Sequence, residues 1–178
     1  MQSGLNQLRP SSSHKNLLLI FYLFILKYAI ISLENWFVMD ICNGGAFKMD
    51  LKEIEKYWIE SSQDAFDTTK TLFENNKFVY SMFFLHLSIE KMLKALFVNQ
   101  SQAEAPFGHN LQNIASKIEN IDFGKNRMEL FAQITTFNIA GRYDDYKNNF
   151  HNICNLEFAT DYLNKGKELL EWLKSQIK

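Results

Sequence analysis

The side chains best suited to chemistry are a histidine, a glutamate and a lysine that recur every four residues in one apolar segment: His86, Glu90 and Lys94. Positions i, i+4 and i+8 lie on one stripe of an α-helix, so the three groups can line a cleft together. Glu90 can then exchange protons or orient an arginine, because a carboxylate on an otherwise apolar helix needs a partner. The alternative is an ordinary ion pair between Glu90 and Lys94, with His86 as a hydrogen-bonded interior residue.

A second group of polar residues surrounds a Gly-Arg-Tyr-Asp-Asp turn near the end of the chain. Its arginine, Arg142, can bind an anion, and Asp145 can accept a bidentate hydrogen bond from an arginine, so that the turn fastens two helices. Tyr143 and Tyr146 can stack on a base, although aromatic residues at such spacings are more often core or interface. His109 precedes a short helix and either fixes the entry of that helix or faces the same cleft.

Three segments together resemble the HEPN domain, a family of small prokaryotic helical bundles, many of which work on RNA or beside nucleotidyltransferases. They are Phe137–Lys147, His86–Leu96 and Gly108–Leu111, and the resemblance extends over residues 50–178. In the ribonucleases of this family, an arginine is followed after four to six residues by a histidine. That pair stabilises charge at the phosphate and moves a proton.

The histidine that the ribonuclease motif requires is absent after Arg142. The residues at the corresponding distances are Lys147, Asn148 and Asn149, and His151 comes only after eight intervening positions. The Arg-Tyr-x-Asp pattern resembles the subgroup of the family that lacks this histidine, which favours a binding or scaffold role over catalysis. The candidate catalytic residues are therefore only Arg142 and a displaced His151. The candidate ligand- or partner-binding residues are Glu90, Lys94, Arg142, Tyr143, Asp145, Tyr146, His86 and His109.

The resemblance implies an accessory HEPN-domain protein, associated with a nucleotide or RNA and paired with a small nucleotidyltransferase, as in a toxin–antitoxin module. It also implies a homodimer, formed through the helices around the arginine loop. One alternative is a metal-independent endoribonuclease toxin that uses Arg142 with the displaced His151. Another is a plain helical interaction module with no small-molecule ligand. No interpretation requires a cofactor or a metal, and none requires DNA.

The composition fits one packed domain with limited affinity for nucleic acid on its own. The chain has 178 residues, of which 47% are hydrophobic and 15% aromatic, and its formal net charge is −1. A non-specific nucleic-acid binder usually carries a basic excess, so any RNA contact must be local or supplied by a partner. The two cysteines, Cys42 and Cys154, lie far apart and predict neither a zinc site nor a disulfide framework, which fits the cytoplasm.

Residues 1–48 differ in character from the rest of the chain. An apolar run begins at Leu17 and continues to about residue 33, with Lys27 near its middle. A spanning helix needs about 20 apolar residues, so a single-pass membrane anchor is one interpretation. The other is that residues 1–48 are a translated leader and that the natural chain starts at Met49, because Gly44 and Gly45 codons can spell a ribosome-binding sequence. The second interpretation makes residues 49–178 the whole folded domain.

The periodicity of apolar residues predicts helices throughout residues 49–178. Long helices are expected at 51–73, 78–97 and 156–177, with shorter ones at 110–118 and around 128–137. The helix over 78–97 is apolar nearly all round, so it should be central. No segment shows a strand pattern. Helices joined by short loops predict an all-α, antiparallel up-and-down bundle of four to five helices.

Overall fold

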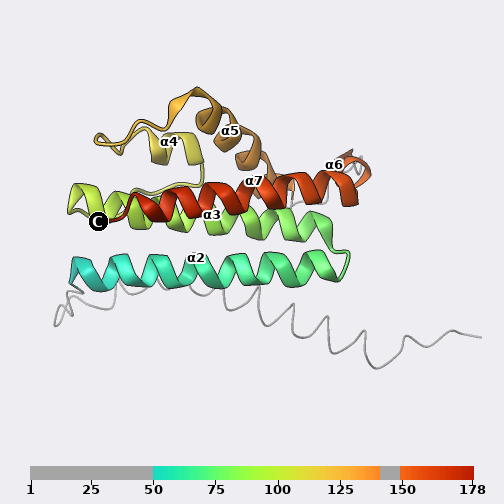
Figure 1. The fold of residues 1–178 in the computed structure, drawn as a ribbon, viewed down its shortest axis with the longest axis horizontal. Coiled ribbons are helices and arrows are strands. Elements are labelled where there is room, and N and C mark those ends of the chain that lie inside the picture. The colour runs from blue at the N-terminus through green and yellow to red at the C-terminus, as the bar shows by residue number, and fades with distance from the viewer. Residues whose placement is uncertain (1–49, 141–148) are drawn as a thin grey trace, which may run out of the picture. The chain divides into compact units, whose positions relative to one another are not determined.

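The computed structural model describes residues 50–140 and 149–178, which form six helices and no strand (Figure 1). The long helices are α2 (Leu51–Glu74), α3 (Phe78–Ser101), α5 (Gly124–Ala140) and α7 (Leu156–Ser175), and the short ones are α4 (Leu111–Ala115) and α6 (Asn149–Ile153). The all-α bundle is confirmed, with the long helices alternating in direction. The predicted leader or anchor segment before Met49 lies outside the described residues. Among the described helices, none is long and apolar enough to cross a membrane.

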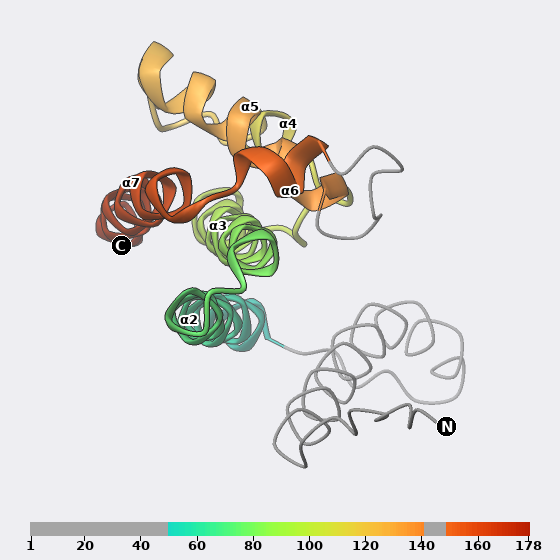
Figure 2. The ribbon, with the colours of Figure 1, turned by 90° about the vertical axis from the view of Figure 1, so that its right-hand side faces the viewer.

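Helix α3 is the centre of the bundle, as its apolar sequence predicts. It packs against α2 on one side and against α7, α5 and α4 on the others (Figure 2). Because neighbouring helices cover α3 on several sides, the side chains around its circumference must be apolar on nearly every face. Fully buried core side chains from α3 and its neighbours include Met82, Leu85, Ile89, Leu93, Phe131, Ile134 and Leu173.

Helix α2 is joined to α3 by small and hydroxyl-bearing side chains. The hydroxyl of Ser62 donates to the carbonyl oxygen of Ser88 at 2.7 Å, and the hydroxyl of Ser88 donates to the carbonyl oxygen of Ser62 at 2.8 Å. Further along, the hydroxyl of Ser81 donates to the carbonyl oxygen of Thr69 at 2.9 Å. All four residues are buried, so these bonds keep the interface free of unpaired hydroxyls.

Helix α7 packs closely against α3 at a glycine, Gly166. A Cβ atom at Gly166 would lie 2.5 Å from Cδ1 of Leu85 and 3.0 Å from its Cδ2, distances that packed atoms do not adopt. The two helices run in the same direction, and the ends of both meet where the Gln100 amide donates to the carbonyl oxygen of Gln176 at 3.2 Å. The absence of a side chain at residue 166 therefore sets how close α7 comes to the core.

Asparagine side chains begin two of the helices. Asn110 Oδ1 accepts from the backbone N–H of Asn113 at 2.9 Å, as expected for the cap of α4. Asn155 does the same for α7 through the N–H of Phe158 at 2.9 Å. The first of these caps, Asn110, directly follows His109 and begins the short helix that the sequence predicts at 110–118.

Candidate functional site

A buried carboxylate, that of Glu90, collects three ionisable side chains. Its Oε1 accepts from Nζ of Lys94 at 2.9 Å, and its Oε2 lies 3.2 Å from Nε2 of His86. Nδ1 of His109 lies 3.0 Å from Oε2 and 3.2 Å from Oε1. These four residues, which we call the Glu90 cluster, were all among the predicted binding residues, and the structure brings them together.

Three members of the Glu90 cluster owe their positions to helix geometry and the fourth to a loop. His86, Glu90 and Lys94 succeed one another at intervals of four on α3, which aligns them along one stripe. His109 comes from the connection between α3 and α4, where Gly108 has a φ of +108° that favours glycine. Just beyond, the backbone N–H of Leu111 donates to Oγ1 of Thr135 at 3.1 Å, so the connection is also held by α5.

The ionisation of Glu90 depends on its partners. Burial of the Glu90 side chain, which is 5% exposed, opposes the charged form and on its own would raise its pKa. The hydrogen bonds from His109 and His86 and the charge of Lys94 outweigh burial and hold the pKa of this carboxyl well below its usual range. Glu90 is therefore an ionised acceptor near neutral pH, and its carboxylate cannot donate a proton there.

Two lysines flank this carboxylate in different settings. Lys94 is 12% exposed, and its ammonium lies 5.0 Å from the ring centroid of Trp58, so α2 contributes a cation–π contact to the edge of the cluster. Lys91 is buried beside α2, where its ammonium donates to the carbonyl oxygen of Ser61 at 3.5 Å. Burial lowers the pKa of Lys91 to about 8, against the opposing charges of Glu90 and Asp64.

The sequence-predicted residues thus divide into three groups. The Glu90 cluster is assembled: Glu90 forms the ion pair with Lys94 that one interpretation expected, and it also binds two imidazoles. A role of Glu90 in proton exchange or in orienting an arginine stays a prediction. His151 lies on α6 at an exposed position, and the contacts of Glu90 do not include it. The predicted Arg142, Tyr143, Asp145 and Tyr146 lie outside the described residues. Three phenylalanines near these tyrosines in the sequence pack in or against the core, namely Phe131, Phe137 and Phe150.

The sequence did not single out the aromatic ring of Trp58 or the buried amide of Asn138. Trp58 fits the apolar pattern of α2, and the spacing along that helix does not indicate that its ring faces Lys94. Asn138, on α5, has a buried side-chain oxygen without a partner. The sequence clue to its burial is that Asn138 follows Ile134 by one helical turn, on a helix whose apolar face is expected to pack against the bundle.

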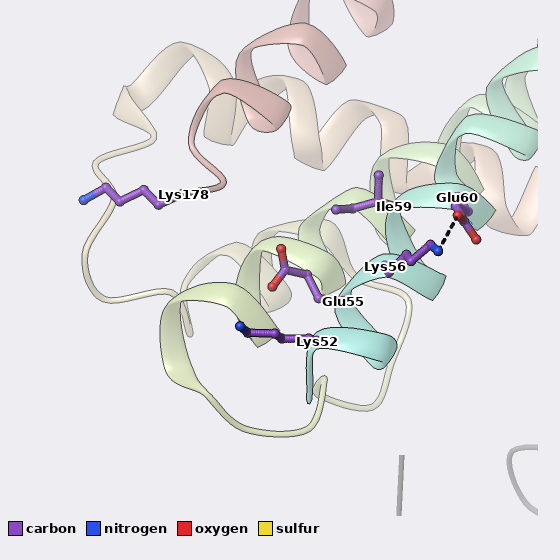
Figure 3. A pocket seen from close by; sticks show the side chains of 6 residues that line it. All are labelled: Lys52, Glu55, Lys56, Ile59, Glu60 and Lys178. Carbon is purple, nitrogen blue, oxygen red and sulfur yellow. Dashed lines mark ion pairs between the residues drawn. The ribbon is translucent and has the colours of Figure 1, made fainter. Parts of the chain in front are cut away.

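The described residues contain no group of three histidine, cysteine, aspartate or glutamate side chains placed to hold a metal ion. Separations of about 3 Å between Glu90 and the two imidazoles are hydrogen-bond distances rather than shared metal ligation. A hollow of about 390 Å³ lies elsewhere, along the first turns of α2 beside Lys178 (Figure 3). Lysines and glutamates line it in nearly equal number, with an ion pair between Lys56 and Glu60 at 3.8 Å, so it selects neither charge.

Comparisons with known proteins place this geometry in context. Residues 55–176 match the family described as the HEPN domain. Among solved structures, the crystal structure of TT1696 from Thermus thermophilus is similar, with a TM-score of 0.59 and 15% sequence identity. The match covers 68% of this chain and 97% of that chain, and at this identity it shows the fold alone. No curated protein matches the sequence.

Proposed function

Because the chain belongs to the HEPN domain family, we propose that it is an accessory HEPN protein that binds RNA or a nucleotide at the Glu90 cluster. In this proposal its partner is a small nucleotidyltransferase, and the two proteins form a toxin–antitoxin module. The convergence of His86, Lys94 and His109 on one buried carboxylate carries the proposal. Burying a charge is costly, and such clusters occur preferentially at functional sites.

The accessible edge of the Glu90 cluster has the chemistry for a phosphate or a base. His109 is 47% exposed and contacts Glu90 through Nδ1, so its Nε2 lies on the opposite side of the ring. Lys94 contacts the same carboxylate and adds a cation, and Trp58 adds an aromatic ring beside that ammonium. A base can stack on an imidazole or an indole, and a phosphate oxygen can accept from an imidazole N–H. With a net charge of −1, the chain as a whole does not attract nucleic acid, so binding would depend on these local contacts.

Binding is favoured over RNA cleavage by the placement of His151. His151 lies on α6 and is separate from the contacts of Glu90, while the positions after Arg142 that the ribonuclease motif requires hold Lys147, Asn148 and Asn149. His109 is already engaged by Glu90 through Nδ1. The proposed role is therefore to hold a ligand and present it to the partner enzyme.

Replacing Lys94 with methionine should weaken RNA or nucleotide binding about tenfold, which corresponds to about 1.4 kcal/mol. Methionine keeps the length of the side chain and removes the ammonium. Fluorescence anisotropy with labelled RNA oligonucleotides, and calorimetry with mononucleotides, would measure the affinity of the protein alone and of its complex with the proposed nucleotidyltransferase partner.

The matched control is Lys167→Met, because Lys167 is exposed on α7 and pairs only with Glu171 at 4.0 Å. This control should leave the affinity unchanged. Equal loss in both variants would mean that binding follows overall charge and would contradict a site at the Glu90 cluster. Metal-independent cleavage of the RNA, abolished by His151→Ala in a folded chain, would instead support the ribonuclease alternative.

The accessory unit is proposed to be a homodimer, and three exposed apolar residues support this. Ile139, Ile153 and Leu156 lie at the end of α5, in α6 and at the start of α7, all at one end of the bundle. Exposed apolar groups that gather at one place commonly mark an interface. Sedimentation at tens of micromolar should show a dimer, and Leu156→Glu should shift it to monomer. Phe107→Glu, on the exposed loop before α4, is the control and should leave the dimer intact.

A further inference from the structure

The carboxylate of Glu90 determines which nitrogen of His109 carries a proton. Nδ1 of His109 lies 3.0 Å from Oε2 and 3.2 Å from Oε1 of this carboxylate. Although burial opposes it, hydrogen bonds from His109 and His86 keep Glu90 ionised near neutral pH, with its pKa well below the usual range. An ionised carboxylate only accepts hydrogen bonds, so Nδ1 of His109 must be the donor. In the neutral ring, Nε2 then has a lone pair and no proton.

The second nitrogen of His109, Nε2, lies on the side of the ring away from Glu90, and the side chain is 47% exposed. Without a proton, Nε2 can only accept a hydrogen bond, and the oxygens of an ionised phosphate can only accept as well. A phosphate therefore cannot bond to Nε2 of the neutral ring. It can do so once Nε2 takes up a proton, because an imidazolium donates from both nitrogens and carries a positive charge.

The groups on α3 beside His109 leave room for that positive charge. The opposite charges of Glu90 and Lys94 cancel in their ion pair, and His86 bonds to the same carboxylate. Nζ of Lys94 and Nδ1 of His109 both contact Oε1 of Glu90, at 2.9 Å and 3.2 Å, so the ammonium and the imidazole meet at one oxygen atom. A second proton on His109 therefore gives the Glu90 cluster a net positive charge at its exposed edge.

The neighbouring elements do not cancel this charge through a direct contact with His109 among the described residues. Helix α5 meets the connection before α4 through the uncharged Thr135, whose Oγ1 accepts from a backbone N–H at 3.1 Å. In the connection itself, Glu104 is exposed and stands five positions before His109. On the side of α3 that faces α2, the buried Lys91 is attracted by the charge of Asp64. The carboxylate that contacts His109 is thus that of Glu90.

We propose, on the basis of the proposed function, that the Glu90 cluster binds a terminal phosphate, a phosphomonoester, and that His109 takes up a proton on Nε2 as this ligand binds. A phosphomonoester carries a charge of about −1.5 to −2 at pH 7, whereas a phosphodiester within an RNA chain carries one negative charge. One imidazolium beside Lys94 concentrates positive charge at a point, so it favours the more highly charged group. The 5′ end of an RNA and a mononucleotide both offer this group.

The test compares pairs of probes that differ only in the terminal phosphate. Calorimetry measures the affinity for adenosine 5′-monophosphate against adenosine, and for an RNA oligonucleotide with a 5′-phosphate against the same oligonucleotide with a 5′-hydroxyl. Titrations at pH 8 in two buffers of different ionisation enthalpy count the protons taken up. The phosphorylated probe should bind at least about tenfold more tightly, with uptake approaching one proton. Its affinity should fall by up to about tenfold for each pH unit above neutrality.

The decisive variant is His109→Asn, which keeps an amide N–H near the position of Nδ1 and removes Nε2. It should lose the preference for the phosphate and the proton uptake together. The matched control, Lys167→Met on the exposed face of α7, should equal the parent protein in both. Circular dichroism checks that each variant is folded. In the parent protein, the ¹⁵N resonance of His109 Nε2 should move on binding from the position of an unprotonated nitrogen to that of a protonated one.

The outcomes separate a failure of this proposal from a failure of the proposed function. Preference for the phosphate together with proton uptake supports the proposal, and the pair of probes that shows it identifies the source as a nucleotide or an RNA end. Equal binding within both pairs, binding without proton uptake, or uptake that persists in a folded His109→Asn chain overturns the proposal and leaves the proposed function standing. Binding of none of the four probes overturns both.

Discussion

Replacing Glu90 with alanine is expected to lower the free energy of unfolding by about 3–5 kcal/mol, the usual cost of removing one partner from a buried charged group. The substitution leaves the ammonium of Lys94 without its carboxylate in a mostly buried position and deprives His86 and His109 of their common acceptor. Urea unfolding at pH 7, followed by circular dichroism, measures the loss. Glu129→Ala is the control, because Glu129 forms only an exposed pair with Lys125 at 3.7 Å, and it should cost less than about 1 kcal/mol.

The stabilities of the parent protein and of Glu90→Ala should also depend differently on pH, in a way that identifies the contribution of the Glu90 carboxylate. The folded-state pKa of Glu90 lies below its unfolded value, so its contribution to stability is present above an unfolded pKa of about 4.3 and is lost as the pH falls through the lower folded pKa. The difference in stability between the parent protein and Glu90→Ala should therefore be larger at pH 7 than at pH 3. A difference that does not change over this range would show that Glu90 contributes through packing rather than charge.

Introducing valine at Gly166 should be nearly as damaging, with a loss of roughly 3 kcal/mol. The new Cβ would overlap the side chain of Leu85, which is itself fully buried, so any shift of its methyl groups must be accommodated within the core. Helix α7 must then move away from α3, or Leu85 must leave its rotamer. Replacing glycine within a helix normally gains up to about 1 kcal/mol, so a net loss isolates the steric term. Thermal and urea unfolding both measure it.

A double-mutant cycle provides the internal control for Gly166. Leu85→Ala removes the atoms that the new side chain would meet, at the cost of a cavity in the core. In that background, Gly166→Ala should be neutral or stabilising, whereas alone it should destabilise the protein. If Gly166→Ala has the same effect in both backgrounds, contact with Leu85 is not what keeps residue 166 a glycine.

Much of the fold follows from the sequence because α3 is recognisable from its composition. Its apolar character on all sides predicts a central helix, and the structure surrounds it with four others. The strict spacing of apolar residues in α7 likewise predicts that helix to within two residues of its end. The short α6, Asn149–Ile153, was missed because five residues are too few to show a helical period.

The candidate site was only partly predictable, and the reason is geometric. Three members of the Glu90 cluster lie on one helix, where spacing alone aligns them. The approach of His109 depends on a loop that crosses α3, and the contact of Trp58 with Lys94 depends on how two helices are aligned. The apolar period of a single helix predicts neither the path of this loop nor the alignment of the two helices. The same limit applies to Asn138, whose buried oxygen is recognisable only once α5 is packed.

The exchange of hydrogen bonds between Ser62 and Ser88 acts as a ruler for the two longest helices. Each hydroxyl donates to the backbone carbonyl of the opposite residue. A displacement of α2 by one turn, about 5.4 Å, would therefore break both bonds at once and leave two buried hydroxyls without a partner. Apolar side chains would let α2 shift along α3, whereas these two hydrogen bonds permit a single axial alignment of the two helices. Trp58 lies one turn from Ser62 and Lys94 lies six residues from Ser88. Two serines that touch no ligand therefore keep the indole opposite the ammonium at the edge of the Glu90 cluster.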